Sequence, residues 1–430
     1  MQPPDLSGAT IGGRMIVYAA KHLLPVASTP IQNGAVSVQD GRIVAVGRRK
    51  DVVKAHPGAE VRDLGDAVIV PGFVNAHTHI ELSFMDGAPP AGGTFMTWIR
   101  DLVSRRSTVD PASAAEAAAK AVESMVLRGT VAVGDVANET WAAALLARSG
   151  LSGLAFHELF GFRAADAEPI LDAAAERLET IDADPDVRAA RDRLTAILTP
   201  HAAHTTSYAL LKALGGRAVA SGEVLSIHVA ESEAEMQLLR DGTGPFKDFL
   251  IERDAWEPTF KAPGTTPVDY LDRLGVLTQR TLAVHCIHID SQDVSRLQAR
   301  GVTVVTCPRS NQRLGVGKAP VLKLLSAGIP VALGTDSLAS APDLDVFTEV
   351  AHLRQDHPLL SPAAALRIAT LNGARALGLA KDLGTIEAGK SAALAVVGLN
   401  DPNDEPLEAV TWSSETVAPL QQAAWEPASR

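Results

Sequence analysis

The chain has 430 residues, and 46% of them are hydrophobic, which is enough for one large core and a small accessory domain. Asp and Glu (50) outnumber Lys and Arg (39), so the formal net charge is −11. Because such a chain repels phosphates and anionic lipids, we expect neither nucleic acid nor membrane as a partner.

The first residues and the cysteines indicate the compartment. Met1–Arg14 lacks the basic start and apolar core of a signal peptide, and no apolar run is long enough to span a bilayer. Cys286 and Cys307 fit neither a disulfide framework nor a zinc ribbon, so we expect both in the core. These features predict a cytoplasmic protein.

The two ends of the chain carry β patterns. Residues 1–67 alternate short β-like runs with turns, as in Ala35–Val38, the Asp40-Gly41 turn and Ile43–Val46. Residues 380–430 have a similar pattern, in which the turn-rich Gly384–Lys390 precedes the apolar run Ala392–Val397. Since neither piece has enough strands to be stable alone, we expect one small β-sandwich domain built from both ends.

Residues 68–379 follow a different rhythm, in which short apolar runs alternate with longer Ala- and Leu-rich helical stretches. The strand candidates are Val68–Asn75, Thr130–Asp135, Leu154–His157, Leu194–Thr199, Val224–His228, Leu282–His285, Val302–Thr306 and Val331–Gly334. Eight βα units close a barrel, so we predict the α/β class and a (β/α)₈ TIM barrel, with a doubly wound open sheet as the alternative. About 50 residues separate strands five and six, and they form either part of a lid or a surface excursion.

Histidines and one aspartate fall at the ends of these strands. His77 and His79 follow strand one, His228 ends strand five, His285 ends strand six and Asp336 follows strand eight. The C-terminal ends of barrel strands converge on one mouth, so these side chains should lie together. Residues i and i+2 of a strand share a face, which lets His77 and His79 bind one metal. Imidazoles with a carboxylate suit zinc and are acceptable to iron, nickel or manganese.

The chemistry around this metal depends on three further assignments. Glu231 could move protons between water and a leaving amine, or it could be an N-cap or a surface ion pair. Asp336 could bind the metal or cap a helix, and His285 could contact the reacting centre or serve as a buried structural histidine. The fourth strand, Leu194–Thr199, has no lysine to bridge two metals, so we expect one divalent ion.

These residues resemble the amidohydrolase superfamily. The similar segments are Val70–His79, His228-Val-Ala-Glu231, His285-Cys286, Cys307–Asn311 and Gly334–Ser337, and the resemblance runs from about residue 14 to 398. The His-X-X-Glu pattern is similar to the mononuclear deaminases of adenosine-like, guanine and cytosine substrates. The resemblance implies one metal, zinc or else iron, and implies as its ligands His77, His79, His228 and Asp336.

The same resemblance implies roles for the remaining site residues. Glu231 would be the proton shuttle, and His285 and Asp336 would orient the attacking hydroxide. The segment Thr199–Ala202 resembles a Pro-His-Ala motif whose histidine contacts the nucleoside, which gives that role to His201. His204 stands where relatives often have tyrosine, and its role is open.

One departure narrows the resemblance. Deaminases of S-adenosylhomocysteine and methylthioadenosine carry a ribose-binding Glu after strand one, but the loop Phe95–Asp101 lacks it. Instead Glu81 follows the His-X-His motif, and with Trp98 and Gly334–Ser340 it is more similar to the aminodeoxyfutalosine deaminases of menaquinone biosynthesis. We expect Glu81 to contact the substrate or to fix a metal-binding histidine, and Trp98 to contact the substrate.

These resemblances predict an aminohydrolase that converts 6-aminodeoxyfutalosine to futalosine and ammonia. The benzoate of that small-molecule nucleoside needs a cation, for which the loops offer Arg163, Arg309 and Arg313. The alternatives are a deaminase of S-adenosylhomocysteine, adenosine or guanine, another amidohydrolase-type C–N, amide or halide hydrolase, or a catalytically silent barrel. The sequence leaves a homodimer open.

Overall fold

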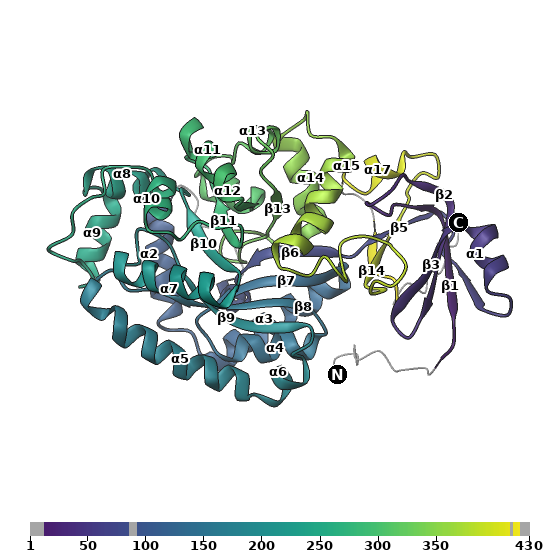
Figure 1. The fold of residues 1–430 in the computed structure, drawn as a ribbon, viewed down its shortest axis with the longest axis horizontal. Helices are drawn as coiled ribbons and strands as arrows, with labels where there is room; N and C mark the ends of the chain where they lie inside the picture. Colours follow the sequence, from purple (N-terminus) through teal and green to yellow (C-terminus); the bar gives the residue numbers. More distant parts are fainter. Residues whose placement is uncertain (1–12, 86–92, 413–415, 422–430) are drawn as a thin grey trace.

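The computed structural model describes residues 13–85, 93–412 and 416–421 (Figure 1). Within these ranges the chain forms a seven-stranded mixed sheet and a larger body of eight parallel strands with helices around them. Most of the Met1–Arg14 segment and the last residues of the predicted 380–430 segment lie outside the described residues. No helix in the described ranges is both long and apolar enough to cross a membrane.

Both ends of the chain contribute to the seven-stranded sheet. Its order is β15-β14-β5-β1-β2-β3, with β4 beside β1. The strands are β1 (Ile16–Leu23), β2 (Ile31–Gln39), β3 (Arg42–Arg48), β4 (Glu60–Asp63), β5 (Ala67–Pro71), β14 (Leu394–Gly398) and β15 (Val417–Pro419). Asp40 and Gly41 have φ of 48° and 71°, as the tight turn between β2 and β3 requires. In the described residues the two chain ends form this one sheet and not two facing sheets, so the sandwich is not confirmed, and the boundaries at 67 and 380 remain our proposal.

The eight parallel strands lie in chain order, as in a (β/α)₈ barrel. They form two four-stranded sheets, β6-β7-β8-β9 and β10-β11-β12-β13, whose edges meet through isolated parallel bridges between Thr78 and Asp336 and between Ala202 and His228. In the part of the chain that the structure describes, no continuous ladder of hydrogen bonds crosses these two seams. The strands are β6 (Phe73–Thr78), β7 (Thr130–Ala137), β8 (Ser152–Leu159), β9 (Leu194–Pro200), β10 (Leu225–Val229), β11 (Thr281–His285), β12 (Thr303–Thr306) and β13 (Val331–Leu333).

The first predicted strand, Val68–Asn75, is wrong as one element. Its first half belongs to β5, which pairs with β14 in the mixed sheet, and its second half belongs to β6. Gly72 separates them, and a Cβ at this position would lie 2.2 Å from Val131 Cγ1 and 2.9 Å from the Ala393 carbonyl oxygen. Gly72 thus allows a close approach at the point between the two strands, in a segment that is buried throughout and apolar as far as Val74.

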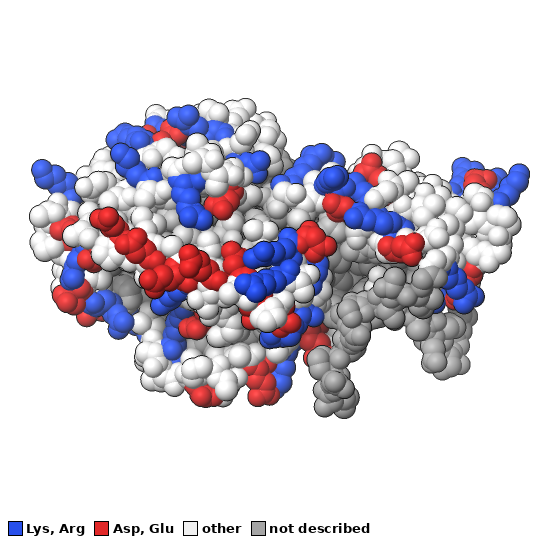
Figure 2. Space-filling model, turned by 60° about the horizontal axis from the view of Figure 1, so that its bottom comes forward, with Lys and Arg blue, Asp and Glu red and all other residues white. Residues whose placement is uncertain are grey.

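Helices follow the strands and surround them (Figure 1). The longer ones are α2 (Phe95–Arg106), α3 (Pro111–Leu127), α4 (Trp141–Ser149), α5 (Ala167–Ala183), α7 (Tyr208–Ser221), α11 (Ser291–Arg300) and α14 (Val346–Asp356). Shorter segments are α1 (Arg49–Ala55), η1 (Ile80–Met85), η2 (Ala164–Asp166), α6 (Pro185–Ala189), α12 (Pro308–Leu314), α13 (Val321–Ser326), α15 (Pro362–Arg367), η3 (Ile368–Asn372), α16 (Gly373–Ala376) and α17 (Pro406–Ala409). Acidic and basic side chains are interspersed on the face shown in Figure 2.

The long connection between β10 and β11 is helical. It contains α8 (Glu233–Asp241), α9 (Pro245–Glu252) and α10 (Pro267–Arg273), which lie at the end of the body away from the mixed sheet (Figure 1). Here α9 packs against α2, since Arg100 makes two 2.9 Å hydrogen bonds to Glu252 and the rings of Phe95 and Phe246 lie 6.3 Å apart. This connection therefore forms part of a wall beside the C-terminal ends of the strands.

Candidate active site

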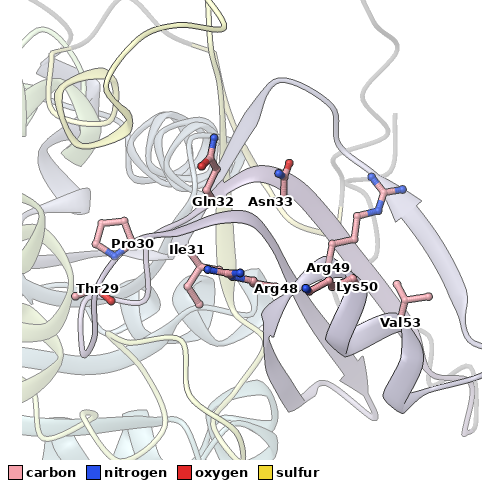
Figure 3. A pocket seen from close by; sticks show the side chains of 9 residues that line it. All are labelled: Thr29, Pro30, Ile31, Gln32, Asn33, Arg48, Arg49, Lys50 and Val53. Carbon is pink, nitrogen blue, oxygen red and sulfur yellow. The ribbon is translucent and has the colours of Figure 1, made fainter.

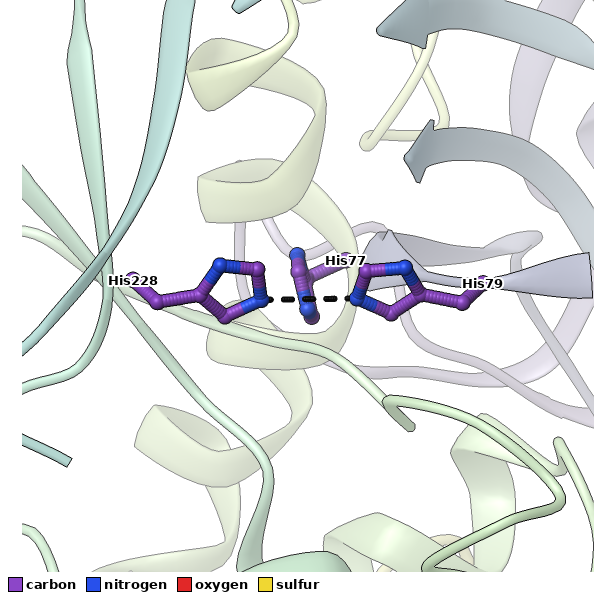
Figure 4. A group of neighbouring side chains, drawn as sticks. All are labelled: His77, His79 and His228. Carbon is purple, nitrogen blue, oxygen red and sulfur yellow. Dashed lines mark hydrogen bonds between the residues drawn. The ribbon is translucent and has the colours of Figure 1, made fainter. Parts of the chain in front are cut away.

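Three histidines converge at the C-terminal ends of β6 and β10 (Figure 4). His77, His79 and His228 each offer one ring nitrogen, and these nitrogens all lie within 4.8 Å of one another. The Nε2 atoms of His79 and His228 are 3.4 Å apart. Asp336 Oδ1 lies 3.9 Å from His77 Nε2 and 3.7 Å from His79 Nε2. The structure thus brings the four predicted metal ligands together.

The chemistry of this cluster fits a divalent metal. His77 is fully buried, and neither of its ring nitrogens has a hydrogen-bond partner in the described residues. Burial lowers the pKa of His77 and His79, and it lowers the pKa of His228 to about 3, so the imidazoles are neutral donors. His228 Nδ1 donates to the His201 carbonyl at 2.9 Å, which leaves His228 Nε2 as the lone-pair donor toward the cluster.

Two serines hold the carboxylate of Asp336. Ser310 Oγ and Ser340 Oγ donate to Asp336 Oδ2 at 2.5 and 2.8 Å, while Oδ1 faces the histidines. Burial raises the pKa of Asp336, but interactions with His79 and His285 and the two serine hydrogen bonds outweigh it, so the net shift is downward. Asp336 is therefore a carboxylate with one oxygen available for a cation.

Glu231 and His285 form a second pair beside the cluster. Glu231 Oε1 lies 3.6 Å from His285 Nε2. His285 Nδ1 lies 2.9 Å from Asn311 Oδ1, and because an amide oxygen accepts, Nδ1 carries the proton and Nε2 faces Glu231. Burial raises the pKa of Glu231. The pair can therefore hold and transfer protons next to a metal.

A buried carboxylate fixes Glu231 from behind. Glu235 Oε2 accepts a 2.9 Å hydrogen bond from the Glu231 backbone amide, and Glu235 Oε1 lies 3.8 Å from His204 Nδ1. The His204 ring packs on Phe246 of α9, with ring centroids 4.0 Å apart. His204 thus connects the wall formed by α9 to the residue that positions Glu231.

The backbone at these strand ends is in the left-handed region. Ala230, His285, Cys286 and Asp336 have φ of 51°, 70°, 49° and 61°. This conformation costs a residue with a Cβ about 1–2 kcal/mol. The amides of Ile287 and His288 donate to the Ala230 carbonyl at 3.1 and 2.9 Å, so the surrounding hydrogen bonds hold the chain in this path. Strained backbone of this kind is frequent where side chains must be aimed at a reacting centre.

A pocket of about 440 Å³ opens above the cluster. Its apolar walls come from α2, α9 and the end of β8, and they include Phe95, Trp98, Ile99, Leu102, Phe160, Phe162, Phe246, Phe249 and Leu250. Trp98 Nε1 donates to the Ala339 carbonyl at 2.9 Å, which fixes the indole at the wall. Such walls suit a flat, partly aromatic ligand.

Polar side chains interrupt the apolar walls. His201 Nδ1 lies 2.6 Å from Thr205 Oγ1, and its ring stacks on Phe160 with centroids 4.4 Å apart. Glu81 Oε1 pairs with Arg106 Nη2 at 2.7 Å, and Glu81 Oε2 accepts from the amides of Asn138 and Glu139, both at 2.9 Å. Both oxygens of Glu81 are thus engaged, and the structure shows no hydrogen bond from Glu81 to a cluster histidine in the described residues.

The three arginines predicted to meet a substrate carboxylate lie elsewhere. Arg309 is buried and pairs with Glu349 and Asp343, both at 2.7 Å, and Arg163 is bonded to Asp254. Arg163, Arg309 and Arg313 are not among the residues that line the pocket. The place of Arg309 in a loop of the sequence does not show that the buried Glu349 and the half-exposed Asp343 occupy its guanidinium.

Several residues of the site carry no role predicted from the sequence. Ser310 and Asn311 stood in a recognised motif, and their position after β12 was a signal that could have suggested contacts to Asp336 and His285. Arg106, Glu158 and Arg253 line the pocket. Their places depend on how distant segments pack, for which the sequence holds no local signal.

A second, larger hollow of about 860 Å³ lies on the mixed sheet (Figure 3). It is lined by Thr29, Pro30, Ile31, Gln32, Asn33, Arg48, Arg49, Lys50 and Val53. No histidine, carboxylate or thiol is among these residues, so this hollow lacks the groups of hydrolytic chemistry.

The parallel strands and the histidine cluster at their C-terminal ends are typical of metal-dependent hydrolases on a (β/α)₈ barrel. Residues 68–421 match the model of the amidohydrolase family, and the chain belongs to this family. A short segment, residues 34–59, also matches the imidazolonepropionase-like composite domain of bacteria. With its deaminase relatives, the family match shows a hydrolase that acts on C–N bonds.

Two relatives cover most of the chain. It is 36% identical to an aminodeoxyfutalosine deaminase of Deinococcus radiodurans, over 80% of this chain and 81% of that protein. It is 33% identical to a 5-methylthioadenosine/S-adenosylhomocysteine deaminase of Nitratidesulfovibrio vulgaris, over 89% of this chain and 82% of that protein.

Two solved structures are also similar. The Helicobacter pylori aminofutalosine deaminase in complex with methylthio-coformycin has a TM-score of 0.80 and 25% identity, covering 92% of this chain and 94% of that one. An adenosine deaminase from Xanthomonas campestris with bound zinc has a TM-score of 0.76 and 26% identity, and the match covers 93% of this chain and 89% of that one.

Proposed function

We propose that the protein catalyses the hydrolytic deamination of an adenine-type nucleoside, and that its substrate is 6-aminodeoxyfutalosine. The observation that supports this most is the floor of the pocket. There, three neutral histidines and Asp336 converge, and the Glu231–His285 pair lies beside them. This combination of a metal-type donor set and a proton-transfer pair suits replacement of an amine by water.

The residues at the base of the pocket have separate roles, and the first of these is metal binding. His77, His79, His228 and Asp336 would hold one divalent ion, for which zinc is our first choice and iron the second. When bound, such an ion activates water for attack at neutral pH.

Proton transfer falls to the pair beside the cluster. Glu231 is placed to accept a proton from the attacking water and pass it to a ring nitrogen, and then to carry the second proton of that water, from the hydroxyl on the attacked carbon, to the departing ammonia. His285, anchored through Nδ1 by Asn311, presents Nε2 to the attacking oxygen and fixes its direction.

The walls of the pocket support a nucleoside with an aromatic substituent. Phe95, Trp98 and Phe246 offer flat apolar surfaces at the side formed by α2 and α9. A benzoate placed there needs a cation, and we assign it to Arg253, an exposed pocket residue that the structure pairs with no carboxylate in the described ranges. Arg106 also lines the pocket, but Glu81 already neutralises it.

The relatives support this class of substrate and leave a second candidate. The Deinococcus relative is named for aminodeoxyfutalosine, and a role on that substrate would place this protein in menaquinone biosynthesis. The Nitratidesulfovibrio relative covers more of the chain at nearly the same identity and favours 5-methylthioadenosine or S-adenosylhomocysteine instead. Adenosine and guanine are two further candidate substrates.

Ammonia release from a panel of nucleosides tests the proposal. The zinc-loaded enzyme should be compared on 6-aminodeoxyfutalosine, S-adenosylhomocysteine, 5-methylthioadenosine, adenosine and guanine at equal metal content. We expect 6-aminodeoxyfutalosine to exceed adenosine by about 10- to 100-fold in kcat/KM, the value of one charge-assisted contact. A higher kcat/KM for any other member would refute the substrate, and no ammonia from any of them would refute the deaminase.

A further inference from the structure

One buried carboxyl group in the pocket wall has no part in the chemistry above. Glu158, near the C-terminal end of β8, is 5% exposed and lines the same pocket as the histidine cluster. Its Oε1 atom has no hydrogen-bond partner in the described residues. A polar atom buried without a partner is costly, so an unpaired carboxyl facing a pocket indicates a partner that arrives with a ligand.

The neighbours of Glu158 do not supply that partner. Arg106 and two backbone amides satisfy Glu81 on the same wall, and the structure pairs Glu158 with no lysine or arginine in the described ranges. His228 Nδ1 lies 3.7 Å from Glu158 Oε1, but this nitrogen already donates to the His201 carbonyl at 2.9 Å. Glu158 therefore keeps its hydrogen-bonding capacity for the pocket.

A metal is not the partner that this arrangement favours. Glu158, His201 and His228 do offer ligand atoms within 4.8 Å of one another. However, His228 Nδ1 carries the proton of its hydrogen bond to a carbonyl, and His228 Nε2 faces the other cluster. Since one imidazole binds one metal through a free lone pair, we place the ion at the His77 cluster and leave the Glu158 side for substrate.

The position of Glu158 matches one part of a nucleoside. The two nitrogens of His228 point to opposite sides of its ring, so Glu158 lies one ring width further from the reacting position than the metal-facing nitrogen. In an adenine nucleoside the amino-bearing carbon and the sugar are at opposite ends of the base. If the amino-bearing carbon lies at the cluster and the base extends along His228 toward β8, the sugar would lie beside Glu158 and His201, whose polar atoms are within 4.8 Å of each other.

We infer that Glu158 is the ribose-binding residue of this enzyme and accepts hydrogen bonds from the vicinal hydroxyls of the sugar. The inference rests on the proposed function, because it requires a nucleoside in the pocket. It also supplies the ribose contact that the loop Phe95–Asp101 lacks and that Glu81, with both oxygens engaged, does not offer.

Removing the hydroxyls and the carboxyl group separately, and then together, tests the inference. The zinc-loaded wild type, Glu158→Gln and Glu158→Leu should be assayed on adenosine, 2′-deoxyadenosine and 3′-deoxyadenosine. We expect the wild type to lose about 10- to 100-fold in kcat/KM when a contacted hydroxyl is removed. Glu158→Leu should lose a similar factor on adenosine but discriminate little among the three nucleosides, and Glu158→Gln, which keeps an acceptor, should lie between.

Comparing the three enzymes on the three nucleosides distinguishes a substrate contact of Glu158 from a structural role. A substitution that merely disturbs the fold would lower all three activities alike and leave the preference for ribose intact, which would overturn the inference. Equal wild-type activity on the three nucleosides would overturn it as well, while the deaminase proposal would stand. If no adenine nucleoside releases ammonia, both fail together. Glu179→Gln, on an exposed position of α5, is the matched control and should change neither activity nor preference.

Discussion

Replacing Glu231 by glutamine tests the division of labour in the site. Glutamine keeps the length of the side chain and an acceptor oxygen near His285 Nε2, which lies 3.6 Å from Glu231 Oε1, but it cannot take up a proton. Glu231 lies outside the three-histidine group, so the variant should retain its metal. General acid–base catalysis contributes about 10²–10⁴-fold, so kcat should fall by that factor, equivalent to about 3–5 kcal/mol.

The pH profile gives the same prediction a second readout. Burial raises the pKa of Glu231, and a base must be ionised to accept a proton, so wild-type kcat/KM should fall as the pH drops through that raised pKa. The variant should lack this acidic limb. Glu233→Gln is the matched control, because its side chain is 77% exposed and contacts His288 rather than the cluster. Near-normal kcat in Glu231→Gln, or loss of metal from it, would refute the assignment.

Three further outcomes follow from the same geometry. Elemental analysis of the active protein should find one tightly bound divalent ion per chain, and two equivalents would contradict a single centre held by His77 and its neighbours. His285→Asn should lose activity and keep its metal, because His285 is held by Asn311 outside the three-histidine group; metal loss would make His285 a ligand. Arg253→Gln should raise KM for 6-aminodeoxyfutalosine by about tenfold and leave adenosine unchanged, whereas an equal effect on both would rule out a carboxylate contact.

The cluster of three histidines and Asp336 could be predicted because topology alone brings these side chains together. His77 and His79 share a strand face, and His228 and Asp336 end other strands of the same parallel set, so their convergence needs no knowledge of loops. The Asp40-Gly41 turn was equally accessible, since its residue types favour positive φ. Local patterns of this kind act over a few residues and survive the packing of the whole chain.

The pocket wall could not be predicted in the same way. Arg106 and Phe246 come from connections after different strands, and they line one pocket because α9 packs on α2. The break at Gly72 was hidden because the residues on both sides are apolar and buried. Arg309 was expected in a free loop, but Glu349 binds it inside the fold. Each of these features depends on a partner far away in the sequence.

The carboxyl groups at and behind the pocket differ in their hydrogen-bond partners, and these partners indicate the role of each group. Asp336 accepts from two serine hydroxyls and turns its other oxygen to the histidines, which suits a metal ligand. Glu235 holds a backbone amide, and Glu81 holds two amides and an arginine, so both are fixed within the protein. Glu231 faces an imidazole that can accept a proton. Glu158 Oε1 and Glu235 Oε1 both lack a hydrogen-bond partner in the described residues, but of these two residues only Glu158 lines the pocket, and for that reason we assign its partner to the substrate.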